Sequence, residues 1–299
     1  MDVNVFVIIV TYKGKQWYDR CFNSLLASSV SVNIVVVDNA SEDGSVEYIK
    51  ERFPIINVIE SKENLGFGRA NNIGMRYAFD HECDYVFLLN QDAWVEVDTI
   101  ETLVKCHKKN PSFGVISPVH MTGDGKSMNF LLNDGNHNRD FLSDLYCGTI
   151  KDLYTISYVN AAAWLMPRMT LEKIGGFCPI IFHYGEDDDY LNRLRYHHIK
   201  IGLCPSTKIF HDTRNRLDES IRFFQKANVE KIDEYLDITK DVNLFKTCSL
   251  FFKKMLCNLL KGDMKAYKQC FNQLCFLVKH KKAIKTCRAK HKVLQANWL

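Results

Sequence analysis

Several familiar signatures are missing from this chain of 299 residues. No stretch is long and apolar enough to span a membrane. The apolar run near the start, residues 5–10, is short and strand-like, and Asp2 stands where a signal peptide has basic residues, so we expect no signal peptide. The 11 cysteines contain no C-x-x-C pair, which argues against a zinc ribbon or a thioredoxin motif. Free, mostly buried thiols in a cytoplasmic protein are therefore expected.

Glycine-rich phosphate loops are also missing. No G-x-x-x-x-G-K-[ST] occurs, which excludes a P-loop. The segment GFGRAN (66–71) lacks the third glycine of a dinucleotide fingerprint and follows the third predicted strand, not the first. TYKGK (11–15) lacks the glycine-rich opening of a sugar-phosphate nucleotidyltransferase. A nucleotide bound here would be held by side chains, with a carboxylate such as Asp38 for the base or ribose and a cation for the diphosphate.

Strand and helix signals alternate over the first 120 residues. Apolar strands are predicted at 5–10, 32–38, 56–61, 85–90 and 113–119, and helices at 17–28, 45–53, 69–81 and 97–109. This alternation predicts an α/β fold with a mostly parallel central sheet and helices on both faces. In such sheets ligands bind beyond the carboxyl ends of the strands.

The second part of the chain is less regular. Residues 121–148 indicate a long, partly irregular loop or insertion, and 156–167 resume a strand or buried segment. Residues 200–212 predict a short strand pair that ends at His211, and after about Arg214 the pattern is helical.

Charge divides the chain into an acidic body and a basic tail. From Phe245 to Leu299 there are 13 Lys or Arg and one acidic residue, so this segment carries about +12 and residues 1–244 about −8. Apolar tail residues recur at helical spacing: Leu250, Phe251, Met255, Leu256, Leu259, then Phe271, Leu274, Cys275 and Val278. The tail is therefore interpreted either as helices that pack on the body or on a second subunit, or as a peripheral contact with an anionic membrane.

Polar residues follow the predicted strands at the edge where ligands bind. Thr11 and Tyr12 follow the first strand, Asp38 and Asn39 end the second, ENLGFGRANN (63–72) follows the third, and Asn90-Gln91-Asp92 ends the fourth. Each alone is also explained as a turn or a helix cap. Asp92 offers an oxygen ligand for Mg²⁺ or Mn²⁺, and His211 is either a second ligand or a structural histidine.

Together these motifs resemble a family 2 glycosyltransferase with the GT-A fold. The resemblance covers roughly residues 3–212, through VIIVTYKG, VVVDNASEDGS, NLGFGRANN, YVFLLNQD, NAAAWLMPRMTLEKIGGF, FHYGEDDDYLNRLR and IFH. The combination of N-x-G-x-x-x-A-N-N and L-N-x-D is similar to the branch that contains many bacterial rhamnosyltransferases. It implies a nucleotide pocket lined by Thr11, Tyr12, Asp38, Asn39, Asn64, Gly66, Arg69 and Asn90. It also implies Asp92 and His211 as metal or diphosphate contacts and Asp187 as the catalytic base.

The run of four acids in HYGEDDDYLNRLR (183–195) needs a separate explanation. Acids are common in the first turn of a helix, where the dipole favours them. Since successive helix residues point about 100° apart, the four cannot face one cleft. We expect Glu186 and Asp189 to share a face, Asp189 to pair with Arg193, Asp188 to be solvated and Asp187 to face the acceptor. Neighbouring carboxylates would raise the pKa of Asp187. Glu186 would either help to hold the acceptor or steady Asp187.

The resemblance implies an inverting, single-displacement transfer. The donor would be dTDP-rhamnose or a UDP-sugar, and the acceptor a glycan or lipid-linked glycan in cell-surface polysaccharide synthesis, with Mn²⁺ or Mg²⁺ on the diphosphate. Trp164 is interpreted as an acceptor contact or as a core residue. Residues 1–215 would form the catalytic domain, with a nucleotide-sugar half (1–120) and an acceptor half (121–215), and residues 216–299 a basic helical region. We expect a cytoplasmic enzyme, in contact with the inner membrane face or dimeric through this region.

Two departures and two alternatives stay open. Asn90 replaces the first Asp of the family's D-x-D, which puts metal dependence in doubt, and Cys178 stands where the family usually has Asp after G-G-F. One alternative is a catalytically degenerate nucleotide-sugar-binding relative, although Asp92, Asp187 and His211 argue against it. The other is a nucleic-acid binder that uses the tail. We expect no nucleic-acid partner, because the tail has few of the aromatic residues on which bases stack.

Overall fold

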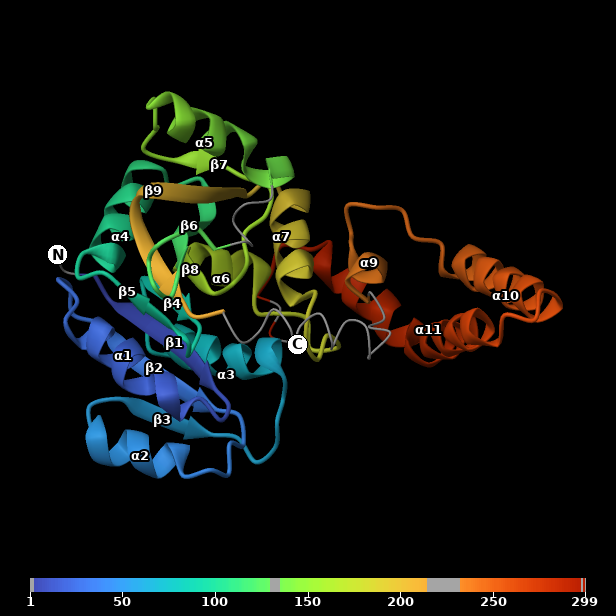
Figure 1. The fold of residues 1–299 in the computed structure, drawn as a ribbon, viewed down its shortest axis with the longest axis horizontal. Coiled ribbons are helices and arrows are strands. Elements are labelled where there is room, and N and C mark those ends of the chain that lie inside the picture. Colours follow the sequence, from blue (N-terminus) through green and yellow to red (C-terminus); the bar gives the residue numbers. More distant parts are fainter. Residues whose placement is uncertain (1–2, 130–134, 214–231, 297, 299) are drawn as a thin grey trace.

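The computed structural model describes residues 3–129, 135–213, 232–296 and 298. Among them, nine strands form one sheet in the order β3-β2-β1-β4-β8-β6-β9-β5, with β7 beside β9 (Figure 1). The strands are β1 (Val5–Thr11), β2 (Asn33–Asp38), β3 (Asn57–Glu60), β4 (Tyr85–Leu89), β5 (Ala93–Val95), β6 (Phe113–Thr122), β7 (Tyr154–Thr155), β8 (Ala163–Pro167) and β9 (Lys200–His211). The helices are α1 (Lys15–Leu26), α2 (Ser45–Arg52), α3 (Phe67–Asp80), α4 (Thr99–Lys109), α5 (Gly135–Cys147), α6 (Arg168–Ile174), α7 (Glu186–Tyr196), α9 (Ile232–Leu236), α10 (Leu244–Leu260) and α11 (Met264–His291).

The predicted α/β fold with a mostly parallel sheet is confirmed. Strands β1, β2, β3, β4, β6 and β9 run in one direction, and β5, β7 and β8 run in the other. The first four strands are joined through helices, as parallel pairing requires. Strand β8 lies antiparallel between β4 and β6, so the sheet changes character where the second half of the chain begins.

Both faces of the sheet are buried, which explains why its strands read as continuous apolar runs. Successive side chains of β1 point to opposite faces: Val5, Val7 and Ile9 pack with residues of α1 and α4, whereas Phe6 and Ile8 pack with residues of α3, α6 and α7. With helices on either face, the polar residues at the strand ends are the ones left at the open edge.

Two predictions about local structure are corrected. Residues 200–211 form one strand, not a pair, because its pairing with β6 continues past a register shift, with Cys204 opposite Pro118 and Lys208 opposite Val119. Pro205 lies in the skipped part, where a ladder bond is not required of it. The insertion at 121–148 contains the helix α5, which covers part of what was expected to be irregular.

The C-terminal helices project from the body as a hairpin of α10 and α11 (Figure 1). The second half of α11 returns to the body, where Leu277 and Ile284 share a core cluster with Ile181 and Leu236. Arg288 fastens this end, because its guanidinium donates to the backbone carbonyls of residues 235, 237 and 240. Within the described ranges, no helix has the length and apolar character needed to cross a bilayer. The division at residue 215 falls outside the described residues and stays a prediction.

Candidate active site

The ends of β1 and β2 form a polar pair at the open edge of the sheet. Thr11 and Asp38 are fully or almost fully buried, and Thr11 Oγ1 donates to Asp38 Oδ1 over 3.0 Å. The parallel register places them directly opposite each other. Ser41 donates its backbone N–H to Asp38 Oδ2 over 2.9 Å and its hydroxyl to Oδ1. The Asp38 carboxylate is therefore rigidly oriented at the position predicted to receive a base or ribose.

The loop before α3 is tied to this pair by amide side chains. Asn39 Nδ2 donates to Asn64 Oδ1 over 2.9 Å, and Asn64 Oδ1 also accepts the Gly66 N–H over 2.9 Å. Asn39 Oδ1 accepts the Leu65 N–H over 2.7 Å. These bonds bring together three of the residues predicted for the nucleotide pocket. Tyr12 and Arg69 stay exposed beside them, Arg69 in the first turn of α3.

Gly66 joins the nucleotide side to the segment before the acidic helix. Its φ of +78° is one that residues with a side chain rarely adopt, and a Cβ there would lie 1.9 Å from the carbonyl oxygen of Phe182. Asn72, in the same helix, exchanges two hydrogen bonds with the backbone of Phe177, at 2.8 and 2.7 Å. The start of α3 therefore packs against both ends of residues 177–182.

The predicted metal position is assembled where β4 ends and β9 returns. Antiparallel pairing sets Ala93 opposite His211, so Asp92 lies beside His211, and His211 Nε2 is 3.3 Å from Asp92 Oδ1. Asn90 Nδ2 lies 3.4 Å from the same ring nitrogen. Asp92 and His211 are buried, and within the described residues His211 Nδ1 has no hydrogen-bond partner. The structure thus brings together the three residues that were predicted here.

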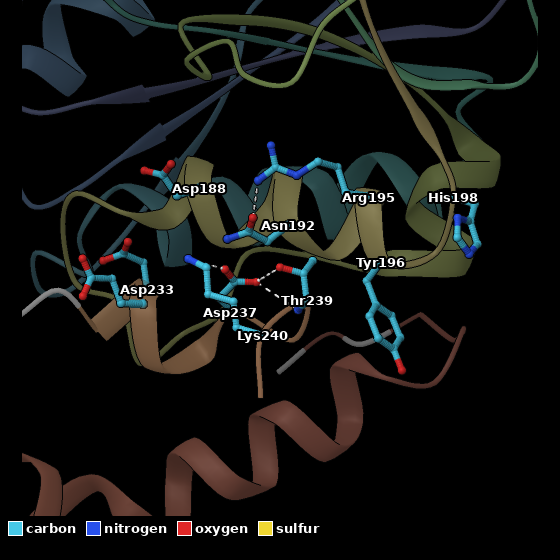
Figure 2. Close-up of a pocket in the computed structure, with 10 residues that line it drawn as sticks. Asp188, Asn192, Arg195, Tyr196, His198, Asp233, Asp237, Thr239 and Lys240 are labelled. Carbon is cyan, nitrogen blue, oxygen red and sulfur yellow. Dashed lines mark hydrogen bonds and ion pairs between the residues drawn. The ribbon is translucent and has the colours of Figure 1, made fainter. Parts of the chain in front are cut away.

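The acidic helix α7 separates its four carboxylates as helical geometry predicts. Gly185 precedes it with a φ of +95°. Asp189 and Glu186 are buried, and Asp189 Oδ2 pairs with Arg193 Nε over 3.0 Å. Asp188 borders an open polar groove of about 740 Å³ between α7 and α9, which Figure 2 shows. Asp187 is not among the residues that line this groove.

Two adjacent backbone groups connect the predicted metal position to Asp187. The Asn90 N–H donates to the Ala162 carbonyl over 3.0 Å, and the Ala161 N–H donates to Asp187 Oδ2 over 3.1 Å. The turn before β8 is itself held by Asn160, whose Oδ1 accepts the Ala162 N–H. One short segment therefore positions Asn90 and Asp187 relative to each other.

The pKa values of the neighbouring carboxyl groups of Glu186 and Asp187 are both raised. Burial raises the pKa of Glu186 to about 7. Burial is also the largest cause that raises the pKa of Asp187, followed by the charge of Glu186, while the Ala161 N–H acts in the opposite direction. The sequence predicted an effect of neighbouring carboxylates, and the structure adds desolvation as the larger cause. A carboxylate with a raised pKa is a stronger base.

The structure corrects the interpretation of Trp164 as an acceptor contact. Its side chain is fully buried in the core, with its ring 6.1 Å from Phe177 and 5.8 Å from Tyr190, centroid to centroid. A sugar cannot reach this ring without opening the core. The core alternative is the one that the structure supports, because Trp164 in β8 points to the face covered by α7.

Sequence reasoning missed several supporting residues. Gln91, the middle residue of N-Q-D, pairs its amide with both backbone groups of Tyr12, at 2.9 and 3.1 Å. Ser41 and Asn72 fix the Asp38 carboxylate and the Phe177 backbone. Gln91 and Asn72 lie inside the motifs N-Q-D and ENLGFGRANN, and this position in the sequence could have marked them as site residues. Their hydrogen-bond partners, however, are 79 and 105 residues away in the chain.

Comparison with known proteins agrees with this geometry. The model of the family "Glycosyl transferase family 2" matches residues 6–175. The chain belongs to this family. It is thus a glycosyltransferase, and its sheet is that of the GT-A fold.

Relatives of this family 2 glycosyltransferase are named as hexosyl- and rhamnosyltransferases. It is 24% identical over 270 residues to the low-salt glycan biosynthesis hexosyltransferase Agl10 of Haloferax volcanii, covering 84% of this chain and 85% of the relative. It is 25% identical over 229 residues to the N-acetylglucosaminyl-diphospho-decaprenol L-rhamnosyltransferase of Mycobacterium tuberculosis, covering 69% and 75%. A solved structure of GalNAc-T7 with UDP, GalNAc and Mn²⁺ superposes with a TM-score of 0.56 at 16% identity, covering 70% of this chain and 44% of that one.

Proposed function

We propose that this glycosyltransferase moves a sugar from a nucleoside diphosphate donor to a hydroxyl of a glycan or lipid-linked glycan, with inversion at the anomeric carbon. The observation that carries the proposal is the shared support of Asn90 and Asp187 by Ala162 and Ala161. A diphosphate bound beside Asn90 and Asp92 would then be separated from the Asp187 carboxylate only by the short segment that contains Ala161 and Ala162. That is the arrangement an in-line displacement needs.

Asp187 is the base in this proposal. The Ala161 N–H orients its carboxylate, and its raised pKa favours removal of the proton from the acceptor hydroxyl as that oxygen attacks. Glu186 supports Asp187 through its charge, since it lies next to it and is buried. Thr11, Asp38 and the Asn39–Asn64 pair would hold the nucleoside. Arg69, which is exposed in the first turn of α3, would meet the diphosphate.

A divalent cation fits the residues at the strand end. Asp92 Oδ1 and His211 Nε2 are 3.3 Å apart, close to the roughly 3 Å between neighbouring ligands of one octahedral ion. Oxygen ligands together with an imidazole suit Mn²⁺ better than Mg²⁺. Asp92 and His211 would hold the ion, with the Asn90 amide beside them. When bound, it offsets negative charge on the diphosphate leaving group.

The donor sugar is proposed from relatives whose names differ. The mycobacterial relative is named for rhamnose, whereas GalNAc-T7 was solved with UDP. dTDP-rhamnose and UDP-hexoses are therefore the donors to test first. The lipid-linked acceptor is proposed because the mycobacterial relative is named for a decaprenol-linked one.

The tail hairpin is proposed to contact an anionic membrane surface. On α10, Leu250, Leu256, Leu259 and Leu260 are between 43% and 87% exposed, among lysines that are also exposed. Apolar and basic side chains together suit a surface of anionic lipid, which would bring the enzyme to a lipid-linked acceptor. Pairing of the same apolar residues in a homodimer is the alternative.

The test is a thermal-shift panel of sugar nucleotides, with and without Mn²⁺, followed by a transfer assay. A donor at 100 times its Kd raises stability by about 2.7 kcal/mol, which such an assay resolves. Asp187→Asn should keep donor binding and lose transfer, because the base acts in the transition state. If Asp187→Asn keeps more than about a tenth of kcat, a deficit of only about 1.4 kcal/mol, Asp187 is not the base.

A further inference from the structure

A second group of reactive side chains lies behind the acidic helix, outside the site described above. The Cys178 thiol, an oxygen of Asp189 and a ring nitrogen of His291 lie within 4.8 Å of one another, and all three residues are buried. Asp189 comes from α7, His291 is the last residue of α11, and Cys178 lies between α6 and α7. The proposed transfer reaction uses none of them.

Three polar atoms of this group have no hydrogen-bond partner within the described part of the chain. Neither ring nitrogen of His291 has a hydrogen-bond partner, although its side chain is 0% exposed. Asp189 Oδ1 has none either, and it lies 3.7 Å from His291 Nδ1, beyond hydrogen-bond distance. Buried polar atoms without partners are rare in proteins, and a bound ion is one of the explanations for them.

A fourth donor comes from the same helix as His291. Cys287 lies four residues earlier on α11, so the two side chains share a face. Its thiol interacts with that of Cys178, and this contact is the largest cause that raises the pKa of Cys178 and lowers the pKa of Cys287. Through this contact the Cys287 thiol lies beside the group of Cys178, Asp189 and His291.

The backbone around the four donors is already fixed. The His197 ring donates to the His291 carbonyl over 2.7 Å, and the Arg288 guanidinium holds the last turns of α11 to the segment after α9. Arg193 pairs with Asp189 Oδ2 and donates to the carbonyls of Ile174 and Gly176. The pairing with Arg193 leaves Asp189 Oδ1 for the cluster.

We propose that Cys178, Cys287, Asp189 and His291 bind a Zn²⁺ ion that fastens the end of α11 to α7. Thiolate and imidazole ligands select Zn²⁺ over Mg²⁺ and Mn²⁺, so this ion is distinct from the one at Asp92. Four protein ligands are usual for a structural zinc site. Ligand atoms at 2.0 to 2.3 Å from zinc are about 3.5 Å apart. The atoms of Cys178, Asp189 and His291 lie within 4.8 Å of one another, so these three and the Cys287 thiol would move closer together when the ion binds.

Charge also favours a bound zinc ion here. Two thiolates, a carboxylate and a neutral imidazole give the Zn²⁺ site a net charge of −1, and the buried Arg193 guanidinium beside it restores neutrality. Asp189 lies two residues from Asp187, so the ion would hold the first turn of α7 from behind. The role is one of positioning. The sequence departure at Cys178 would then be a metal ligand contributed by this chain.

The experiment uses the full-length chain under reducing conditions, freed of metal and then titrated with Zn²⁺ or Co²⁺. We expect about one zinc per chain, a cobalt spectrum with thiolate charge-transfer bands, and a thermal midpoint that rises with Zn²⁺ but not with Mn²⁺. Cys178→Ser and His291→Gln should each lower zinc affinity at least tenfold. Cys275→Ser is the matched control, because Cys275 is exposed on the same helix.

Three outcomes would overturn the proposal. The first is a wild-type chain that retains no more zinc than Cys178→Ser does. The second is a control variant that loses as much affinity as Cys178→Ser. The third is a disulfide between Cys178 and Cys287 in protein taken from reducing cells, found by peptide mass mapping. If the two ligand variants do not fold, the cobalt spectrum of the wild-type chain decides, since absence of thiolate bands also refutes the site.

Discussion

Replacing Glu186 by glutamine should change how the stability of the enzyme depends on pH. Glu186 is 6% exposed, and within the described residues its Oε2 has no hydrogen-bond partner. Burial raises its pKa from 4.5 to about 7. The folded chain therefore keeps this proton up to about pH 7, whereas the unfolded chain loses it near 4.5. Stability from this group is present below the unfolded pKa and is lost as the pH rises through the folded pKa.

The magnitude follows from the shift. About 2.5 pKa units at about 1.4 kcal/mol each give roughly 3 kcal/mol, lost between about pH 4.5 and pH 8 in the wild type. Glutamine has no such titration, and the cost of burying its amide does not vary with pH. The difference in unfolding free energy between variant and wild type should thus grow in favour of Glu186→Gln by about 3 kcal/mol over this range.

Urea unfolding at about pH 5 and about pH 8 measures the effect, with Glu51→Gln as the control. Glu51 is exposed on α2, so its replacement removes a carboxylate of the same type without removing a buried one. Parallel pH dependences for wild type and Glu186→Gln would refute the reasoning. The same holds if Glu51→Gln produces a change of equal size.

Three further substitutions test other parts of the molecule. Asp92→Ala should weaken sugar-nucleotide binding at least tenfold, about 1.4 kcal/mol, and abolish stimulation by Mn²⁺; equal affinities with and without EDTA in both proteins would exclude a metal role. Gly148→Ala should cost about 1 to 2 kcal/mol of stability, because Gly148 has a φ of +70° but open space around it. Gly66→Ala should cost several kcal/mol more, because a Cβ there would also clash with the backbone of Phe182. Equal costs for the two variants in urea unfolding would contradict this expectation. Lys253 and Lys254 are both exposed on α10, so the double variant Lys253→Glu, Lys254→Glu should bind anionic vesicles less well than the wild type at low salt. If the wild-type chain does not bind such vesicles, oligomerisation is left as the role of the hairpin.

Local patterns predicted the first half of the fold because both faces of its strands are buried. The apolar runs at Val5–Thr11 and Tyr85–Leu89 are typical of strands that are buried on both faces. The polar residues that follow these runs lie at the edge of the parallel sheet where ligands bind. The pair of Asp189 and Arg193 was also predictable, since residues four apart on a helix are neighbours.

Other features depend on contacts that local patterns do not contain. Trp164 lies in the core and not at a sugar site because α7 packs on β8. The sequence around Trp164 would be the same in either case, so it could not decide between them. The single long strand at 200–211 depends on β6 accepting a register shift. Cys178 and His291 are 113 positions apart in the sequence, so no short motif predicts that they lie together.

The turn at Ala161 and Ala162 has a consequence for how the enzyme accommodates different acceptors. Because neighbouring peptide units hold Asn90 on one side and Asp187 on the other, the position of each residue relative to the other depends on one short backbone segment. In the proposed reaction, acceptor preference would therefore diverge through the surrounding surfaces, such as the groove along α7 and α9, without a change in this segment.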